Sequence, residues 1–146
     1  MTVVSPYEVR RARGEQEYTD LLELRYQVFC VEQGVPRYEE VDGRDHGAVH
    51  LVAVRDETVF GTCRLVFVGT TVQFSRLAVR KSARRRGIAS TLLEEADAQT
   101  RAGGARRLVL HAQTYARELY ERAGYVPRGR EFREAGIEHV AMEKQL

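Results

Sequence analysis

The segment with the clearest chemical signature is Arg84-Arg85-Arg86-Gly87-Ile88-Ala89, which lies between a predicted strand and a predicted helix. The first turn of a helix has backbone N–H groups without intrahelical partners, and the helix dipole adds partial positive charge there. Gly87 lacks a side chain where the backbone must approach a ligand, and the neighbouring arginines can pair with phosphate oxygens. The segment therefore predicts an anion site suited to a pyrophosphate.

The basic run 80–86 also has two other interpretations. It fits a solvated basic surface, and it fits a patch that binds nucleic acid. The run has no interleaved aromatic residues and no helix-turn-helix or RNA-binding signature, so nucleic acid is not the expected partner. The pattern GxxxxGK(S/T) of a Walker P-loop does not occur.

The N-terminal half predicts a helix followed by an antiparallel meander. Apolar residues near helical spacing indicate a helix over residues 18–31, and the charged segment 33–47 indicates a loop or a short irregular element. Three strands are expected over 50–55, 59–68 and 71–79. The turns between them, Asp56-Glu57 and Gly69-Thr70, are short enough for hairpins.

The hydrophobic period then changes from that of a strand to that of a helix. A helix is expected over 87–102 with Gly103-Gly104 as its stop, then a buried strand over 108–112. Thr114 is expected to cap a helix that runs to Ala123, and strands are expected over 126–132 and 138–144. The strand–helix–strand unit within 73–112 implies a parallel pair with a right-handed crossover, and so a mixed α/β sheet.

The motif Arg84-x-x-Gly87-x-Ala89 after a strand resembles the signature (R/Q)xxGx(G/A) of the GNAT superfamily of N-acetyltransferases. The segment 116–125 is similar to a second motif of that family, with Tyr125 where Phe is commoner. Residues 25–36 with Glu40, Asp42, Asp45 and His50, together with 136–142, resemble the ElaA-like branch. The resemblance implies an acyl-CoA N-acyltransferase fold, a central mixed and mostly antiparallel sheet flanked by helices.

The resemblance also implies acetyl-CoA as co-substrate, held by loop amides at its pyrophosphate and by a splayed strand at its pantetheine arm. Gln113 stands where many members carry an Asn that contacts CoA. The residues that these positions assign to the cofactor are Leu77, Ala78, Val79, Arg84, Arg85, Arg86, Gly87, Ile88, Ala89, Ser90 and Gln113.

Acetyl transfer to an amine requires an acid for the departing thiolate, a base for the amine and a donor for the oxyanion. A phenol is protonated at neutral pH, and the family places a Tyr near the sulfur, so Tyr120 is the expected general acid. The candidate bases are Glu32, His111 and His139, and a water chain is an alternative to all three. The backbone N–H of Val79 is the expected oxyanion donor.

The composition fits one globular domain over residues 1–146, with a net charge of +2. Cys30 and Cys63 form no CxxC pair and no metal-ligand spacing, so no metal is expected and both are expected to be reduced in a cytoplasmic setting. Residues 1–18 do not resemble a signal peptide, and no apolar stretch is long enough to span a membrane. A homodimer is compatible with the resemblance.

The expected function is therefore an N-acetyltransferase that acts on a primary amine of a small molecule or peptide. The alternative is a catalytically silent CoA-binding regulatory module. The acidic run Glu39, Glu40, Asp42 and Asp45 offers attraction for a cationic acceptor, or else forms a solvated loop. Nothing in the sequence identifies the acceptor.

Overall fold

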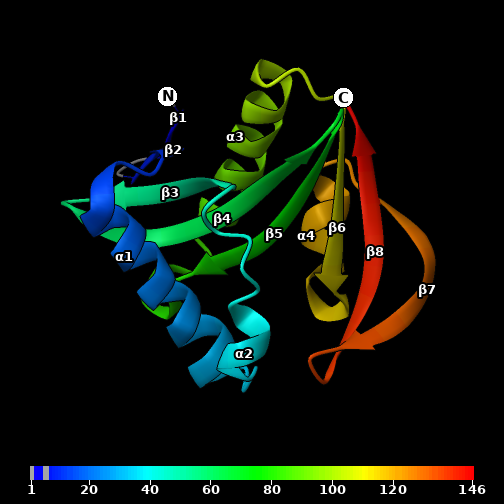
Figure 1. Cartoon of the computed structure of the whole chain (residues 1–146), viewed down its shortest axis with the longest axis horizontal. Coiled ribbons are helices and arrows are strands. Elements are labelled where there is room, and N and C mark those ends of the chain that lie inside the picture. The colour runs from blue at the N-terminus through cyan, green and yellow to red at the C-terminus, as the bar shows by residue number, and fades with distance from the viewer. Residues whose placement is uncertain (1, 5–6) are drawn as a thin grey trace.

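The computed structural model describes residues 2–4 and 7–146, with side chains from Tyr7 onward. Its strands form one eight-stranded sheet in the order β1-β2-β3-β4-β5-β6-β8-β7 (Figure 1). Neighbouring strands pair antiparallel, except that β5 and β6 are parallel. The strands are β1 (Thr2–Val4), β2 (Tyr7–Arg11), β3 (Val49–Arg55), β4 (Thr58–Val68), β5 (Thr71–Val79), β6 (Arg107–Gln113), β7 (Val126–Glu134) and β8 (Ile137–Gln145).

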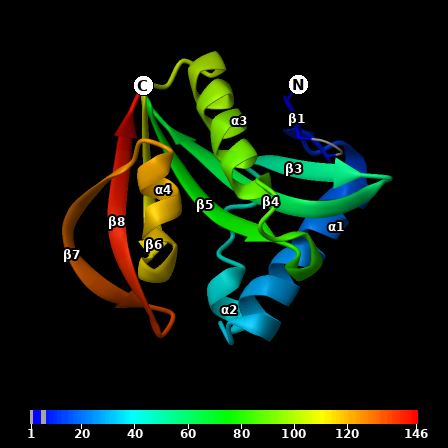
Figure 2. The same ribbon diagram turned by 180° about the vertical axis from the view of Figure 1, so that it is seen from behind.

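Helices cover both faces of this sheet. On one face lie α1 (Gly14–Arg25), its π-helical continuation Tyr26–Glu32, and the short α2 (Arg37–Glu40). On the other face lie α3 (Ile88–Ala102) and α4 (Arg117–Arg122), as the reverse view shows (Figure 2). The connection from β5 through α3 to the parallel strand β6 places the start of α3 beside the end of β5.

Strand alternation divides the buried side chains between two cores. In β3, Leu51 and Ala53 face α3, whereas Val52 and Val54 face α1. Cys63 is buried in the α3 core, as the sequence predicts. Gly61 lets α3 approach the sheet closely, because a Cβ there would lie 2.7 Å from Cγ2 of Ile88. Packing against β4 thus fixes the first residue of α3.

The predicted mixed, mostly antiparallel sheet flanked by helices is confirmed, and so is the parallel pairing across the strand–helix–strand unit. Both predicted hairpin turns are present, with Asp56 and Glu57 at positive φ, as twisted two-residue hairpins require. No helix in the described part of the chain is long and apolar enough to cross a membrane.

Three local predictions were wrong. The first helix begins at Gly14, not at residue 18, and becomes π-helical at Tyr26, where the wider turn departs from the 3.6-residue period. Thr114 makes no cap, because a 3₁₀ turn over Thr114–Ala116 precedes α4 and Ala116 occupies the cap position. Strands β1 and β2 were not predicted, although Tyr7 and Val9 show the buried alternation of a strand.

Candidate active site

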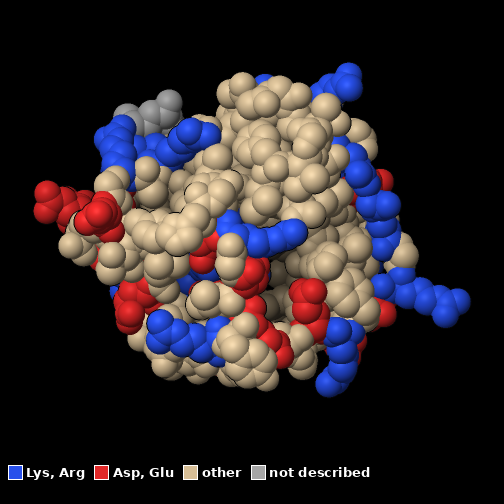
Figure 3. Space-filling model, viewed as in Figure 1, with Lys and Arg blue, Asp and Glu red and all other residues tan. Residues whose placement is uncertain are grey.

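A large cleft opens where β5 and β6 separate. The two strands pair only from Thr71 with Arg107 to Gln73 with Val109. Beyond these residues β5 stays with β4 and β6 stays with β8, so the strand ends diverge. The resulting cleft has a volume of about 1450 Å³. On the face of the molecule that carries α1, the surface is hollowed between α2 and β6, with acidic and basic side chains at the rim (Figure 3).

A β-bulge interrupts β5 just beyond the point where it leaves β6. Thr62 pairs with Ala78 and Arg64 pairs with Ser75, so Arg76 and Leu77 together oppose the single residue Cys63. Arg76 has φ +59°, a left-handed conformation that costs free energy in a residue with a side chain. After the bulge, Leu77 and Val79 pack against the α3 core and Ala78 against the α1 core. These three residues line the cleft.

The N–H group of Val79 points away from β4. Arg80 donates its backbone N–H to the carbonyl oxygen of Phe60 at 2.7 Å. Because N–H directions alternate along a strand, the preceding N–H is turned to the opposite side, toward the cleft. The carbonyl oxygen of Val79 points the same way, where it accepts a hydrogen bond from Nε of Arg84 at 3.0 Å.

The loop before α3 has the conformation that an anion site requires. Gly87, the N-cap residue, has φ +80°, and a Cβ there would meet no atom within 4 Å. The first amide that bonds back is that of Thr91, which donates to the carbonyl oxygen of Gly87 at 3.1 Å. The amides of the first turn before it have no intrahelical partner. Of the loop residues expected to bind cofactor, the cleft lining includes Arg84, Arg85, Gly87, Ile88, Ala89 and Ser90 but not Arg86.

Glu32 and Arg84, expected in separate roles, form an ion pair. Nη2 of Arg84 donates to both carboxylate oxygens of Glu32, at 3.0 and 2.8 Å. The pair connects the end of the π-helical segment to the loop before α3 across the cleft mouth. With both oxygens engaged by a guanidinium, Glu32 is poorly suited to accept a proton from an amine.

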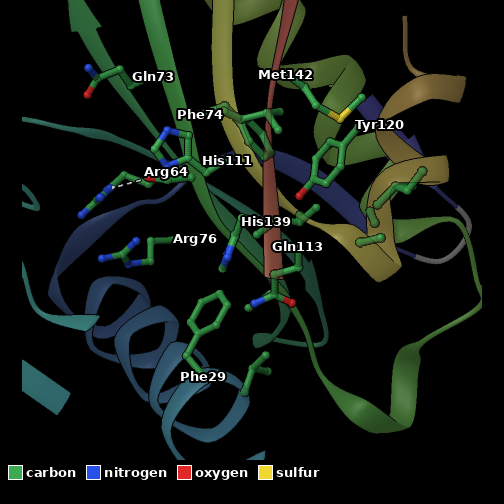
Figure 4. A pocket seen from close by; sticks show the side chains of 18 of the residues that line it. Phe29, Arg64, Gln73, Phe74, Arg76, His111, Gln113, Tyr120, His139 and Met142 are labelled. Atoms are coloured by element: carbon green, nitrogen blue, oxygen red, sulfur yellow. Dashed lines mark hydrogen bonds between the residues drawn. The ribbon is translucent and has the colours of Figure 1, made fainter. Parts of the chain in front are cut away.

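Tyr120 is buried in α4 with its ring against two aromatic residues. The Phe74 and Tyr125 rings pack edge to face against it, with centroids 6.3 and 5.9 Å away. Burial raises the pKa of Tyr120 well above its usual value, so its hydroxyl stays protonated. In Figure 4 this hydroxyl points into the space that Gln113 and His139 also border.

His111 and His139 both lie near the carboxylate of Glu134. Glu134 was not singled out from the sequence. Nδ1 of His111 lies 3.1 Å from Oε1 of Glu134, and Nε2 of His139 lies 3.8 Å from Oε2. Both rings contact Phe132, His139 by stacking and His111 edge to face. His139 is 6% exposed, whereas the other two polar side chains are about half exposed. Glu134 reaches His139 across the β7–β8 hairpin and reaches His111 through the further pairing of β8 with β6, so no local signal marks its role.

Gln113 binds across the cleft to the opposite wall. Its Nε2 donates to Oε1 of Gln33 at 2.8 Å, and Nε2 of Gln33 donates to Oε1 of Gln113 at 3.3 Å. Nε2 of Gln33 also lies 3.1 Å from the hydroxyl of Tyr115. The amide of Gln113 thus lies at the mouth of the cleft.

The acidic run is not a free attractant for cations, because three arginines neutralise most of it. Arg25 pairs with Glu40 and Asp45, Arg64 with Asp42 and Asp45, and Arg76 with Glu40 and Asp42. Arg25 is 1% exposed and Arg64 is 3% exposed. Hydrogen bonding to Arg64 lowers the pKa of Asp42 well below its usual range.

This ionic cluster fastens the α2 segment over the bulge in β5. Arg76 also donates from Nη2 to the carbonyl oxygen of Glu40 at 2.8 Å. The strained bulge is therefore anchored to the segment that forms one wall of the cleft. Within the part of the chain that the structure describes, no group of three or more His, Cys, Asp or Glu side chains is arranged to hold a metal ion.

The splayed sheet, the bulged strand and the helix start beside it define the class of acyl-CoA N-acyltransferases. The model of the acetyltransferase (GNAT) domain family matches residues 15–146, so the chain belongs to that family. It is 33% identical over 134 residues to an uncharacterized N-acetyltransferase, YjcF, of Bacillus subtilis, covering 91% of this chain and 96% of that protein.

Solved structures of other proteins share this fold. An acyl-CoA N-acyltransferase from Pseudomonas aeruginosa is 31% identical with a TM-score of 0.83, covering 94% of this chain and 98% of that one. Escherichia coli ElaA has a TM-score of 0.85 at 21% identity, covering 95% and 99%, so the resemblance to the ElaA-like branch is confirmed at the level of the fold. An aminoglycoside 6′-N-acetyltransferase complexed with coenzyme A shares the fold with a TM-score of 0.77 at 14% identity, covering 94% and 96%.

Proposed function

We propose that the chain transfers the acetyl group of acetyl-CoA directly to a primary amine of a small molecule or peptide. The observation that carries the proposal is the cleft between β5 and β6, which has the N-terminus of α3 with its unpaired first-turn amides at one end and a buried phenol in its wall. Family membership supports acetyl transfer, and a structural relative that contains coenzyme A supports the identity of the co-substrate.

The residues of the loop fit a diphosphate. The left-handed Gly87 leaves open space where a Cβ would stand, and the first-turn amides of α3 supply donors. In the proposal, these amides hold the pyrophosphate of acetyl-CoA, with Arg85 beside them. Leu77, Ala78 and Val79 hold the pantetheine arm, and Gln113 contacts it after separating from Gln33. Arg84 positions the loop through Glu32 and Val79 rather than contacting phosphate.

The chemical groups of the cleft have complementary roles in the proposal. The co-substrate supplies an activated acetyl carbon with a thiol leaving group. The N–H of Val79 points into the cleft, where it stabilises negative charge on the acetyl oxygen. As the amine nitrogen bonds to the acetyl carbon, the carbon–sulfur bond breaks with its electron pair remaining on sulfur. Tyr120 gives its hydroxyl proton to that sulfur.

The test is release of CoA thiol from acetyl-CoA in the presence of a panel of primary amines. The panel contains alkylamines, arylethylamines, polyamines and short peptides with a free amine. We expect saturable, amine-dependent thiol release with at least one class. If acetyl-CoA binds but no amine raises thiol release above the amine-free rate, the chain is a CoA-binding module and the proposal is wrong.

A further inference from the structure

We propose that Glu134 and His139 form the subsite for the acceptor amine, with Glu134 binding the ammonium group and Nε2 of His139 taking its proton. The inference rests on the proposed function and assigns a role to Glu134, which the sequence did not single out. It also selects one base from the three candidates.

The hydrogen bonds of His139 fix its tautomer. Nδ1 lies 2.7 Å from the carbonyl oxygen of Ile137. A carbonyl oxygen only accepts hydrogen bonds, so Nδ1 must carry a proton. In the neutral ring the lone pair is therefore on Nε2, the atom directed at Glu134. Backbone geometry thus prepares Nε2 to accept a proton.

The spacing of the acceptor atoms of His139 and Glu134 suits a donor with several N–H groups. Nε2 and Oε2 of Glu134 are 3.8 Å apart, beyond hydrogen-bond distance. In the neutral tautomer both atoms are acceptors, so they cannot bond to each other. An ammonium group that lies beside the pair, within hydrogen-bond distance of both atoms, donates one N–H to each and neutralises the carboxylate. Phe132, stacked on the ring of His139, adds an aromatic surface.

The rest of the cluster keeps the carboxylate in place without blocking it. Oε1 of Glu134 lies 3.1 Å from Nδ1 of His111, whose ring packs against the same Phe132. His111 is then a positioning residue. Glu134 is half exposed, so an amine reaches it from solvent.

The register of the sheet places this subsite next to the chemistry. His139 pairs with Gln113 across β8 and β6, and both line the cleft with Tyr120. Figure 4 shows the ring of His139 and the hydroxyl of Tyr120 bordering one space. The competing base, Glu32, has both carboxylate oxygens engaged by Arg84.

The proton step balances as follows. One N–H bond of the ammonium breaks, its electron pair stays on nitrogen and the proton moves to Nε2 of His139. The neutral amine attacks with that electron pair, and the imidazolium formed is stabilised by Glu134. A second nitrogen proton leaves as the amide forms and passes through water to the Tyr120 oxygen, which restores the hydroxyl that protonated the sulfur. His139 returns its proton to water.

The first experiment requires no turnover. Nitrogen-15 NMR of the histidine rings is recorded on CoA-saturated protein titrated with n-butylammonium chloride, and with 1-butanol as neutral control at matched ionic strength. We expect an Nδ1-protonated neutral His139, assigned with His139→Gln, and saturable shifts with the ammonium ion only. A ring protonated at Nε2 alone, or equal shifts with the alcohol, would overturn the proposal.

Variants then distinguish the effect of the Glu134 carboxylate from a general effect of altering the β7–β8 hairpin. Glu134→Gln should raise the butylammonium concentration at half-saturation at least tenfold, whereas His111→Gln should raise it less, because the carboxylate remains and only its positioning contact is lost. Glu138→Gln is the matched control, since it removes the same charge from an ion pair with Arg133 in the same hairpin. An unchanged butylammonium response in Glu134→Gln contradicts the proposal.

Kinetics with the best amine of the panel give a second readout. We expect Glu134→Gln to raise the KM for the amine about 10- to 100-fold, the loss of one charge-assisted hydrogen bond, with the KM for acetyl-CoA unchanged. His139→Gln should lower kcat, with partial rescue by added imidazole. If the NMR response holds but no amine is acetylated, the proposed function fails while the amine subsite stands.

Discussion

At the scale of single residues, the hydroxyl of Tyr120 can be removed without loss of the ring contacts that pack this side chain. The ring packs against Phe74 and Tyr125, and these contacts do not involve the hydroxyl. We expect Tyr120→Phe to lower kcat about 100- to 10,000-fold, the usual contribution of a general acid. Affinity for acetyl-CoA by calorimetry and the Tm should stay close to those of the wild type. An unchanged kcat would remove Tyr120 from the mechanism.

Residue types that carry chemistry could be chosen from the sequence, but their partners could not. Tyr120, His111 and His139 stand in recognisable segments, and the structure brings all three to the cleft. The pair of Glu32 with Arg84 depends on how distant segments dock, and the approach of Glu134 to His139 depends on the register of the β7–β8 hairpin. The ion pairs of Arg25, Arg64 and Arg76 were not predicted, because their carboxylate partners are 15 to 36 residues away in the sequence.

At the scale of elements, substitutions at two glycines with the same conformation test the role of the loop before α3. Gly87 precedes α3 and Gly104 follows it, both have φ +80°, and both have open space where a Cβ would stand. Alanine at either position should cost about 1 kcal/mol of unfolding free energy through backbone strain. Gly87→Ala should in addition weaken acetyl-CoA binding about tenfold in calorimetry, because the strain disturbs the proposed cradle. Equal affinities in the two variants would contradict this role.

The regular elements were predictable where hydrophobic period and turn chemistry agreed. The meander with its turns at Asp56-Glu57 and Gly69-Thr70, and the helix between two glycine signals, lie close to their predicted bounds. Strand β2 has only five residues, three of them charged. Its place in the sheet is set by pairing with β3, which is not visible in a short local window. The π-helical turn likewise has no marker in a search for the 3.6-residue period.

At the scale of the whole molecule, the ionic cluster that joins α2 to the sheet should make the free energy of unfolding depend on pH in the acidic range. The folded state depresses the pKa of Asp42 through hydrogen bonding to Arg64. A depressed pKa stabilises the protein above the unfolded value, about 3.9, and this stabilisation is lost as pH falls through that value toward the folded pKa.

We therefore expect Asp42→Asn to lower the free energy of unfolding by about 1 kcal/mol at pH 7, a modest effect because the pair is partly solvated. The difference from wild type should shrink below about pH 4, where Asp42 becomes protonated in the unfolded chain but is still ionised in the folded chain. Urea denaturation at several pH values measures this. Glu39→Gln, in the exposed part of the same segment, is the control and should show little change. A pH-independent difference would rule out linkage to Asp42.

The central claim concerns the whole cleft. We propose that the loop before α3 binds the pyrophosphate of the co-substrate and that the diverging strands β5 and β6 hold its pantetheine arm. Backbone amide NMR of the 146-residue chain during titration with acetyl-CoA tests it most directly. We predict saturable shifts concentrated in residues 77–90 and at the end of β6 near Gln113. The absence of saturable shifts, or shifts confined to the β7 edge of the sheet, would contradict the account.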